Sequence, residues 1–270
     1  TGTSRWFERP DAGMPAGSER VLNRADEEVT NVHMDTTADP GTATTAFLGP
    51  DAEATPALSF VLPTMNEARG IGPCLDAIER VVAEIGVTAE VIVSDSSTDE
   101  TPETARERGA IVVEPDRPGY GYAYRYAFAR ARGELIAMGD ADTTYDFGEL
   151  PRLLDALDRE GADIVIGDRF GGDIKPGAMP PLHKYLGNPA LTAFLNVFYD
   201  ANVNDAHCGL RVLTSEALER LELEADGMEF ASEMIMDASV RDLTIAEVPI
   251  TYHPRAGEST LESPADGCPP

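Results

Sequence analysis

The sequence predicts an α/β fold: a mostly parallel sheet with helices on both faces, followed by a less regular half. Between residues 58 and 167, short apolar runs alternate with helical patterns of roughly 10–15 residues. This alternation is typical of β-α-β units, in which each strand is followed by a helix that returns the chain to a parallel strand. The chain has 270 residues and is 42% hydrophobic, which is enough for one large domain.

Five strands are expected in the first part of the chain, each from a short run rich in valine, isoleucine or leucine: residues 58–62, 91–93, 110–113, 135–138 and 163–167. Between them, apolar residues recur with the helical period and predict helices at residues 66–85, 98–108, 122–132 and 147–160. Prolines at positions 176, 180 and 181 then break the pattern. Beyond them we expect helices at residues 184–199, 215–223 and 230–239, and a strand at 243–252.

The composition restricts the partners of the chain. Its net charge is −27, from 48 acidic and 21 basic residues, and only two of the basic residues are lysines. Such a charge repels the phosphates of nucleic acids, so we expect no nucleic-acid partner. Self-repulsion fades in concentrated salt, because the Debye length falls to about 3 Å at 1 M. We therefore interpret the composition as an adaptation to a salt-rich cytoplasm.

Domain bounds and location follow from the same composition. Residues 1–55 are acidic and poor in large apolar side chains, so we expect a disordered tail there, a domain over residues 56–262 and a second tail over 263–270. No apolar stretch in the sequence is long enough to span a bilayer, and because the first residues contain no apolar segment we expect no secretory signal. Three widely spaced cysteines without metal-type spacing suit a reducing compartment, so a cytoplasmic location is expected.

Acidic residues directly follow three of the expected strands, within residues 63–67, 94–99 and 140–146. In sheets of this kind, ligands bind beyond the carboxyl ends of the strands, where these loops meet. Carboxylates crowded at a sheet edge are costly unless a cation or hydrogen-bond donors compensate them. The sequence therefore predicts a binding site at this edge.

Asp140 and Asp142 are the candidate metal ligands. Two carboxylates separated by one residue at the end of a strand can face one pocket, and oxygen ligands of this kind suit Mg²⁺ or Mn²⁺. A divalent ion there would bridge the protein to a diphosphate and stabilise its leaving charge. In a chain so rich in acids, a solvated acidic turn is the alternative interpretation.

Other polar residues have two interpretations each. Asp95 is placed to accept hydrogen bonds from a nucleobase or ribose, or belongs to a capping loop at the next helix; Asn66 has the same ambiguity. Arg169 and Arg211 are suited to gripping a phosphate, with a salt bridge to a nearby acid as the alternative. A Gly-x-Gly at residues 119–121 lacks the third glycine of a dinucleotide site and follows the wrong strand, so no such site is expected.

Several short motifs follow one another along the chain: Pro63-Thr64-Met65-Asn66-Glu67, Ser94-Asp95-Ser96-Ser97, Asp140-Ala141-Asp142, Gly167-Asp168-Arg169-Phe170, Asp205-Ala206-His207-Cys208-Gly209-Leu210-Arg211, Met228-Glu229-Phe230-Ala231-Ser232-Glu233 and Arg255-Ala256-Gly257-Glu258-Ser259-Thr260. In this order, over about residues 57 to 262, they resemble family 2 glycosyltransferases of the GT-A fold. The resemblance is to the group of dolichol-phosphate mannosyltransferases and polyprenyl-phosphate glucosyltransferases.

The resemblance implies a role for each matched residue. Those implied to contact the donor nucleotide are Pro63, Asn66, Glu67, Asp95 and Asp140. A metal site is implied at Asp142 and Asp140, and the residues implied in catalysis are Asp142, Arg169, Arg211, Asp205 and Glu233. The sequence departs from the family where Ser94 replaces an acid, Thr144 a glutamine that binds metal, Cys208 a serine and Thr260 a lysine.

The implied function is transfer of a hexose from a GDP- or UDP-hexose to a polyprenyl (dolichyl) phosphate, with inversion and with Mg²⁺ or Mn²⁺. A phosphate acceptor is already anionic, so it needs no strong base. One alternative is a soluble sugar or protein acceptor, for which Asp205 or Glu233 would act as base. Another is a degenerate scaffold that only binds nucleotide sugars. A lipid acceptor implies peripheral contact with the inner face of the membrane, and residues 191–198 either lie against lipid or pack in the core.

Overall fold

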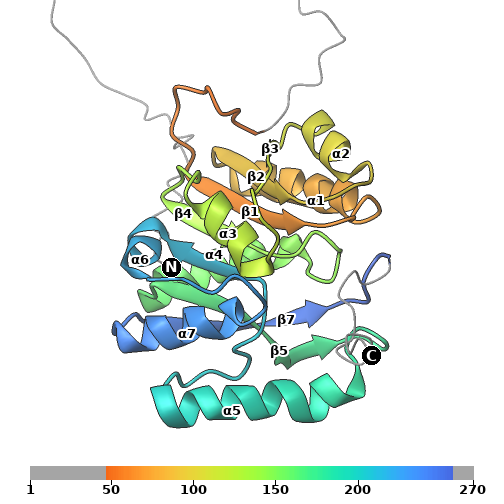
Figure 1. The fold of residues 1–270 in the computed structure, drawn as a ribbon. Helices are drawn as coiled ribbons and strands as arrows, with labels where there is room; N and C mark the ends of the chain where they lie inside the picture. Colours follow the sequence, from red (N-terminus) through yellow and green to blue (C-terminus); the bar gives the residue numbers. More distant parts are fainter. Residues whose placement is uncertain (1–46, 258–270) are drawn as a thin grey trace, which may run out of the picture.

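A computed structural model describes residues 47–257 and shows a seven-stranded mixed sheet with helices on both faces (Figure 1). The strand order is β3-β2-β1-β4-β6-β5-β7. Neighbouring strands are parallel except at β6, which runs antiparallel to both β4 and β5. The strands are β1 (Leu58–Thr64), β2 (Ala89–Asp95), β3 (Ile111–Val113), β4 (Leu135–Met138), β5 (Ile164–Ile174), β6 (Arg211–Thr214) and β7 (Ile245–Tyr252).

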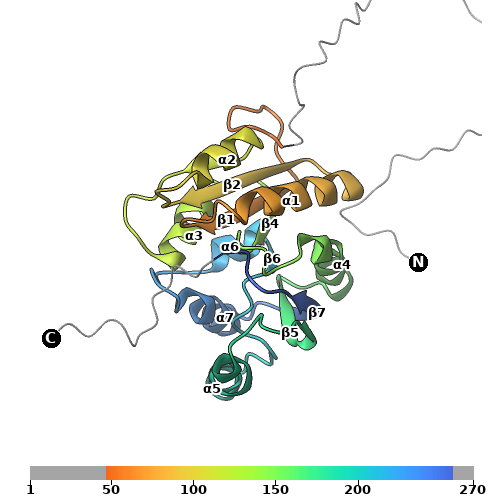
Figure 2. The same ribbon diagram turned by 90° about the vertical axis from the view of Figure 1, so that its right-hand side faces the viewer.

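Helices pack on the two faces of this sheet and form two separate cores (Figure 2). They are α1 (Ile71–Ile85), α2 (Thr101–Glu107), α3 (Tyr120–Phe128), α4 (Leu150–Glu160), α5 (Asn188–Tyr199), α6 (Ser215–Arg220) and α7 (Phe230–Val240), with a 3₁₀ turn η1 (Phe147–Glu149) and a π-helical turn η2 (His183–Gly187). Alternation along β1 illustrates the division: Phe60 and Leu62 face the core shared with α1 and α4, whereas Val61 faces the core shared with α3 and α7.

Two features of the second half differ from the expected elements. β5 continues to Ile174 instead of ending at residue 167, and pairs with β7 on both sides of a register shift. β6 was not expected as a strand, because its four residues are few and open with a charged Arg211. The antiparallel β6 lies between β4 and β5, so it brings the segment before Arg211 next to the end of β4.

The described chain begins before the expected start of the domain. Phe47 is buried and forms a bridge with Ala89, while the Arg132 guanidinium donates to the backbone oxygens of Gly49 and Ala52. This packing places the start of the folded region earlier than residue 56. The expectations for residues 1–46 and 258–270 lie outside the described residues; they include Thr260, Cys268 and the second tail over residues 263–270.

Two findings concern the compartment and the membrane. Cys74 and Cys208 are free and buried. Over residues 47–257, no helix combines the length and the apolar character that crossing a bilayer requires.

Candidate active site

The loops after β1 and β2 are joined by side chains at the carboxyl ends of these strands. The Thr64 hydroxyl donates to Asp95 Oδ1 (2.6 Å), and the backbone N–H of Asn66 donates to Ser97 Oγ (2.7 Å). Asn66 Oδ1 accepts in return from the backbone N–H of Thr98 (2.9 Å), and Asn66 has a positive φ of 61°. Asn66 therefore ties the two loops together and does not cap α1, which has no side-chain cap.

Asp95 is buried at this edge, with 4% of its surface exposed. Its Oδ1 accepts from the hydroxyls of Thr64 and Ser97, and its Oδ2 accepts from the backbone N–H of Ser97 (3.2 Å). Pro63, in β1, is partly exposed beside it. A nucleoside contact by Asp95 remains a prediction, with Oδ2 the less occupied of its two oxygens.

Asp140 and Asp142 lie in the turn after β4. Asp142 is 6% exposed, and its Oδ1 accepts from the backbone N–H (3.0 Å) and the hydroxyl (2.6 Å) of Thr144. Asp140 Oδ1 accepts from the Tyr120 hydroxyl (3.1 Å). Desolvation, followed by the neighbouring charge of Asp142, raises the pKa of Asp140 to about 7. The negative charge of Asp142 therefore disfavours ionisation of Asp140. One oxygen of each carboxylate accepts a hydrogen bond from a hydroxyl group.

Two glycines, Gly70 and Gly209, let other segments of the chain pack closely against the turn after β4. A Cβ at Gly70 would lie 2.2 Å from the backbone oxygen of Ala141, so only glycine lets the start of α1 pack against the turn. A Cβ at Gly209 would lie 3.1 Å from Asp140 Oδ2. The backbone N–H of Gly209 also donates to the Tyr145 hydroxyl (2.7 Å), which holds the 205–211 segment beside the turn.

Arg255, in the segment after β7, faces the acids of the first half. Its Nη2 pairs with Glu67 Oε1, its Nε lies 3.6 Å from Asp142 Oδ2, and the next residue donates its N–H to the backbone oxygen of Asp142 (2.9 Å). Arg255 Nε is buried and finds no hydrogen-bond acceptor among residues 47–257. Burial raises the pKa of Glu67, and the Arg255 charge opposes that rise. We call Glu67, Asp140 and Asp142 the carboxylate edge.

The carboxylate edge has the chemistry of an incomplete divalent-cation site. Its oxygen ligands suit Mg²⁺ or Mn²⁺, and burial followed by the charge of Asp142 raises the pKa of Asp140, a rise that a bound cation would oppose. In the described part of the chain, however, no three His, Cys, Asp or Glu side chains are grouped as a metal site. Asp140 and Asp142 can therefore hold an ion only with further ligands, and phosphate oxygens of a bound diphosphate are suitable.

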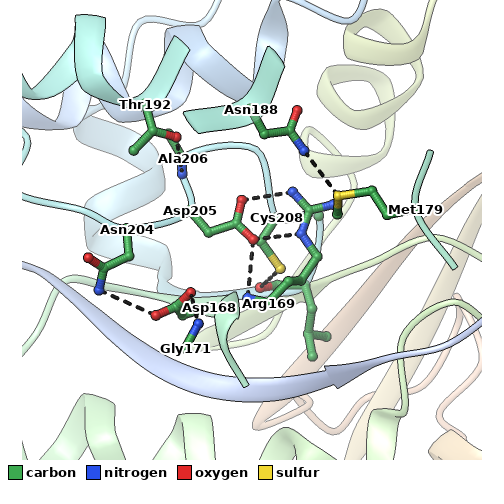
Figure 3. A network of polar contacts seen from close by, with 12 residues as sticks. Asp168, Arg169, Gly171, Met179, Asn188, Thr192, Asn204, Asp205, Ala206 and Cys208 are labelled. Carbon is green, nitrogen blue, oxygen red and sulfur yellow. Dashed lines mark hydrogen bonds and ion pairs between the residues drawn. The ribbon is translucent and has the colours of Figure 1, made fainter. Parts of the chain in front are cut away.

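Arg169, in β5, is held by Asp205 in a bidentate ion pair (Figure 3). Arg169 Nε donates to Asp205 Oδ2 (2.6 Å) and Nη2 donates to Oδ1 (2.7 Å), while Asp205 is fully buried. The Asp205 backbone N–H is fixed in turn by Glu247 Oε1 (3.0 Å). The Arg169 guanidinium also lies over the Tyr252 ring, 5.1 Å from its centre. The structure shows the salt bridge for Arg169, and a phosphate contact by Arg169 remains a prediction.

Arg211 is fully buried and binds backbone oxygens instead of an acid. Its Nε donates to Cys208 (2.9 Å), and its Nη2 donates to Ala206 (2.9 Å) and to Ala231 in α7 (3.1 Å). Its Nη1 is buried without an acceptor among the described residues, and burial lowers the pKa of Arg211. These contacts hold the 206–208 loop against α7. A phosphate contact by Arg211 would need to use Nη1 and remains a prediction.

Glu233, in α7, binds the backbone of the loop that precedes this helix. Its Oε1 accepts from the N–H of Glu224 (2.9 Å), and both of its oxygens accept from the N–H of Ala225 (3.1 and 3.0 Å). Nearby, His207 Nε2 lies 2.8 Å from Ser232 Oγ. The structure therefore brings Glu67, Asp140, Asp142 and Arg255 together, and separately joins Arg169 to Asp205; it gives Glu233 loop-binding contacts.

Sequence reasoning did not assign roles to three residues that position the carboxylate edge. Tyr120 lies in the Gly-x-Gly segment that was examined only as a dinucleotide motif, Thr144 was noted only as a departure, and Arg255 only as part of a loop motif. A hydroxyl two residues after an acid is a detectable signal for Thr144. Tyr120 and Arg255 have no such signal, because they are 20 and 113 residues away from their Asp140 and Asp142 partners.

Comparisons with known proteins identify the family of this chain. The family described as Glycosyl transferase family 2 matches residues 59–222. The low-salt glycan biosynthesis hexosyltransferase Agl6 of Haloferax volcanii is 56% identical over 221 residues, which cover 82% of this chain and 54% of that protein. A dolichyl-phosphate hexose transferase of the same organism is 36% identical, covering 78% of this chain and 89% of that protein. These relatives agree with the acid-rich, halophilic composition.

A solved structure has the same architecture. Glucosyl-3-phosphoglycerate synthase from Mycobacterium tuberculosis, in complex with Mn²⁺, uridine diphosphate and glucosyl-3-phosphoglycerate, superposes with a TM-score of 0.61 at 26% identity. The alignment covers 78% of this chain and 74% of that one. The chain spans about half the length of Agl6 but most of the length of the dolichyl-phosphate hexose transferase. The chain belongs to glycosyltransferase family 2 and has the GT-A fold.

Proposed function

We propose that this chain transfers a hexose from a nucleotide diphosphate sugar to a polyprenyl phosphate of the dolichyl type, with inversion at the anomeric carbon. The observation that carries the proposal is the carboxylate pair after β4, whose charge Arg255 compensates only in part. The similarity to a dolichyl-phosphate hexose transferase over most of that protein's length supports the acceptor class. A Mn²⁺ and uridine diphosphate complex of a solved relative supports a divalent ion and a nucleotide donor.

In the reaction, an oxygen of the acceptor phosphate forms a bond to the anomeric carbon while the bond from that carbon to the donor diphosphate breaks. The electron pair of the broken bond leaves with the diphosphate. A divalent ion, Mg²⁺ or Mn²⁺, supplies positive charge to the leaving diphosphate when it is bound. Asp142 and Asp140 would hold that ion, because Thr144 and Tyr120 hydrogen-bond to one oxygen of each; the second oxygen of Asp142 has only the longer ion pair with Arg255.

Arg169 is prepared to bind a phosphate group. Its Nε and Nη2 are used by Asp205, which fixes the plane of the guanidinium, and Nη1 is the guanidinium nitrogen that this ion pair does not use. A fixed, buried guanidinium binds phosphate without the entropy cost of ordering a free side chain. We assign Asp205 to positioning Arg169, and Arg169 to the acceptor phosphate or the donor diphosphate.

A soluble sugar or protein acceptor is the alternative, and the name of the solved glucosyl-3-phosphoglycerate synthase favours a small acceptor for that relative. A hydroxyl acceptor needs a general base. The two carboxylates considered for that role are engaged: Asp205 by Arg169, and Glu233 by backbone N–H groups. An acceptor phosphate is anionic without a base, so these contacts support the lipid phosphate. We assign the reaction to the inner face of the membrane, because a charged donor made inside the cell does not cross a bilayer.

The proposal is tested by a transfer assay in high salt with radiolabelled UDP- and GDP-hexoses, Mg²⁺ or Mn²⁺, and dolichyl phosphate. We expect label in the organic extract, dependent on both the metal and the lipid. Label in water-soluble product alone would support the alternative and contradict the lipid acceptor. Nucleotide-sugar binding without any transfer would support the scaffold interpretation.

A further inference from the structure

Helix α5 turns Thr192, Asn196 and a single fully buried apolar side chain, Leu195, inward, and exposes most of its other apolar side chains. Thr192 is buried and its hydroxyl accepts from the backbone N–H of Ala206 (3.4 Å), while the Asn196 amide bonds both backbone groups of Val203 (2.7 and 3.1 Å). The opposite face of the helix is apolar and exposed: Ala190, Leu191, Ala193, Phe194, Val197 and Phe198. A helix on the surface of a globular protein normally exposes polar side chains, so the large exposed apolar face of α5 is unusual.

The exposed apolar surface extends into the turn before the helix. Leu182, Tyr185 and Leu186 are 65%, 75% and 62% exposed, and Val197 at the other end is 76% exposed. Figures 1 and 2 both place α5 at the periphery of the molecule, on the far side of α7 from the sheet. We call the exposed apolar side chains within residues 182–198 the α5 face. Contiguous apolar surface of this kind marks a site that is covered by a partner or a membrane.

The charge around the α5 face differs from that of the whole chain. Residues 174–199 contain no aspartate or glutamate, although the chain has 48 acids in 270 residues. Both lysines of the chain, Lys175 and Lys184, lie in this stretch. Lys175 pairs with Asp173, whereas the Lys184 ammonium lies 5.7 Å from the centre of the Tyr185 ring. A tyrosine and a lysine beside apolar side chains is the composition of a membrane–water boundary.

From these observations we propose that the α5 face docks on the surface of an anionic lipid bilayer. Apolar side chains of the face enter the boundary of the acyl chains, and Lys184 lies among the lipid phosphates. A second copy of the chain fits less well, because a two-fold contact between α5 faces would bring like lysines together on two molecules of net charge −27.

The docked helix is connected through one segment of the chain to the arginine that we assign to a phosphate. The segment bound by the inner face of α5, residues 203–206, contains Asp205, which holds Arg169 (Figure 3). A bilayer on the outer face of α5 would therefore bring a membrane-embedded phosphate close to this part of the site. The inference deepens the proposed function, but its evidence is the helix itself and its test does not require transfer.

The test is flotation of the 270-residue chain with vesicles in 2 M KCl. We expect the chain to float with phosphatidylglycerol vesicles, and the double variant Phe194→Ser/Phe198→Ser to bind about tenfold less or weaker still. Val240→Ser, which changes an equally exposed apolar residue on α7, should float like the unchanged chain. A second double variant, Leu191→Ser/Val197→Ser, repeats the test with other side chains of the same face, and circular dichroism checks the folding of each variant.

Charge is tested separately by Lys184→Glu, which should weaken binding to anionic vesicles a few-fold at lower salt and leave binding to phosphatidylcholine vesicles unchanged. The docking proposal is overturned if the chain stays unbound, or if both folded double variants float like the unchanged chain. It is also overturned if light scattering without vesicles shows a dimer that the double variants dissociate. Flotation without hexose transfer would leave the docking proposal intact and contradict the proposed function.

Discussion

The carboxylate edge and the Arg169–Asp205 pair are close enough for the Arg169 charge to act on Asp140, yet their charges are compensated in different ways. Asp140 and Asp142 share one edge with Arg255, which comes from a distant part of the sequence, and burial followed by the charge of Asp142 raises the pKa of Asp140. Arg169 and Asp205 neutralise each other through two short hydrogen bonds in a buried position. The first region is built to receive a cation, whereas the second is complete before any ligand arrives. We expect substitutions in the first to act on binding and turnover, and in the second on stability as well.

The largest expected effect is at the metal ligand. Asp142→Ala should reduce metal-dependent hexose transfer at least about a thousandfold, because the ion loses its best-placed protein ligand. The assay is the transfer reaction described above, with Asp146→Ala as the control. Asp146 is an exposed acid four residues along that only caps η1. Equal activity of Asp142→Ala and the control would contradict the assignment of Asp142 as a metal ligand.

The second prediction concerns the buried pair. Asp205→Asn should lower the free energy of unfolding by about 3 kcal/mol, because it leaves the Arg169 charge buried without a counter-charge. It should also lower kcat, since Arg169 loses its fixed orientation. Chemical denaturation in high salt measures the first effect.

A matched control for this prediction lies at the opposite end of the sheet. Glu90 is fully buried and pairs with Arg132 (2.7 Å), far from the site. Glu90→Gln should destabilise the chain to a similar degree while the kcat of the folded fraction stays unchanged. If both variants change kcat equally, Asp205 has no special role in positioning Arg169.

The third prediction follows from the raised pKa of Asp140. Between about pH 4 and pH 7, folded Asp140 keeps a proton that the unfolded chain has released, so stability must fall as the pH rises through this window. Relative to Asp140→Asn, which does not titrate, the metal-free chain should lose on the order of 4 kcal/mol across it. Thermal unfolding at a series of pH values measures the difference, and parallel curves for the two proteins would contradict the assignment.

The smallest expected effect is at Arg255. Its guanidinium provides positive charge beside Asp142 when no ion is bound, so Arg255→Gln should tighten Mn²⁺ binding a few-fold in the absence of nucleotide. Arg159→Gln, which removes an exposed arginine paired on α4, is the control. Isothermal titration compares the affinities. Weaker Mn²⁺ binding by Arg255→Gln would show that the arginine does not compete with the ion.

The same comparison shows how far the sequence could predict the molecule. The carboxylate edge was predictable, because each acid follows directly after an apolar strand and parallel strands end at one edge of a sheet. The fold class and the family were also predicted from the sequence, and both were confirmed. The Arg169–Asp205 pair was not, because its partners are 36 residues apart and only the antiparallel β6 brings them together.

The periodicity of the sequence also could not predict which face of a helix is exposed. The period of residues 184–199 predicts a helix equally well whether its apolar face is buried or exposed. Only the contacts of Thr192 and Asn196 show which side faces inward. The same holds for Arg211 and Glu233, whose backbone partners depend on loop conformations that no periodicity encodes.

The claim that the carboxylate edge is completed by an ion and a diphosphate together has one direct test. Free Mn²⁺ is measured by electron paramagnetic resonance as the chain is added, with and without UDP or GDP. We predict weak Mn²⁺ binding by the chain alone, strong binding when the matching nucleoside diphosphate is present, and loss of the strong binding in Asp142→Asn. Equally strong binding by Asp142→Asn, or by the chain without any nucleotide, would contradict the account.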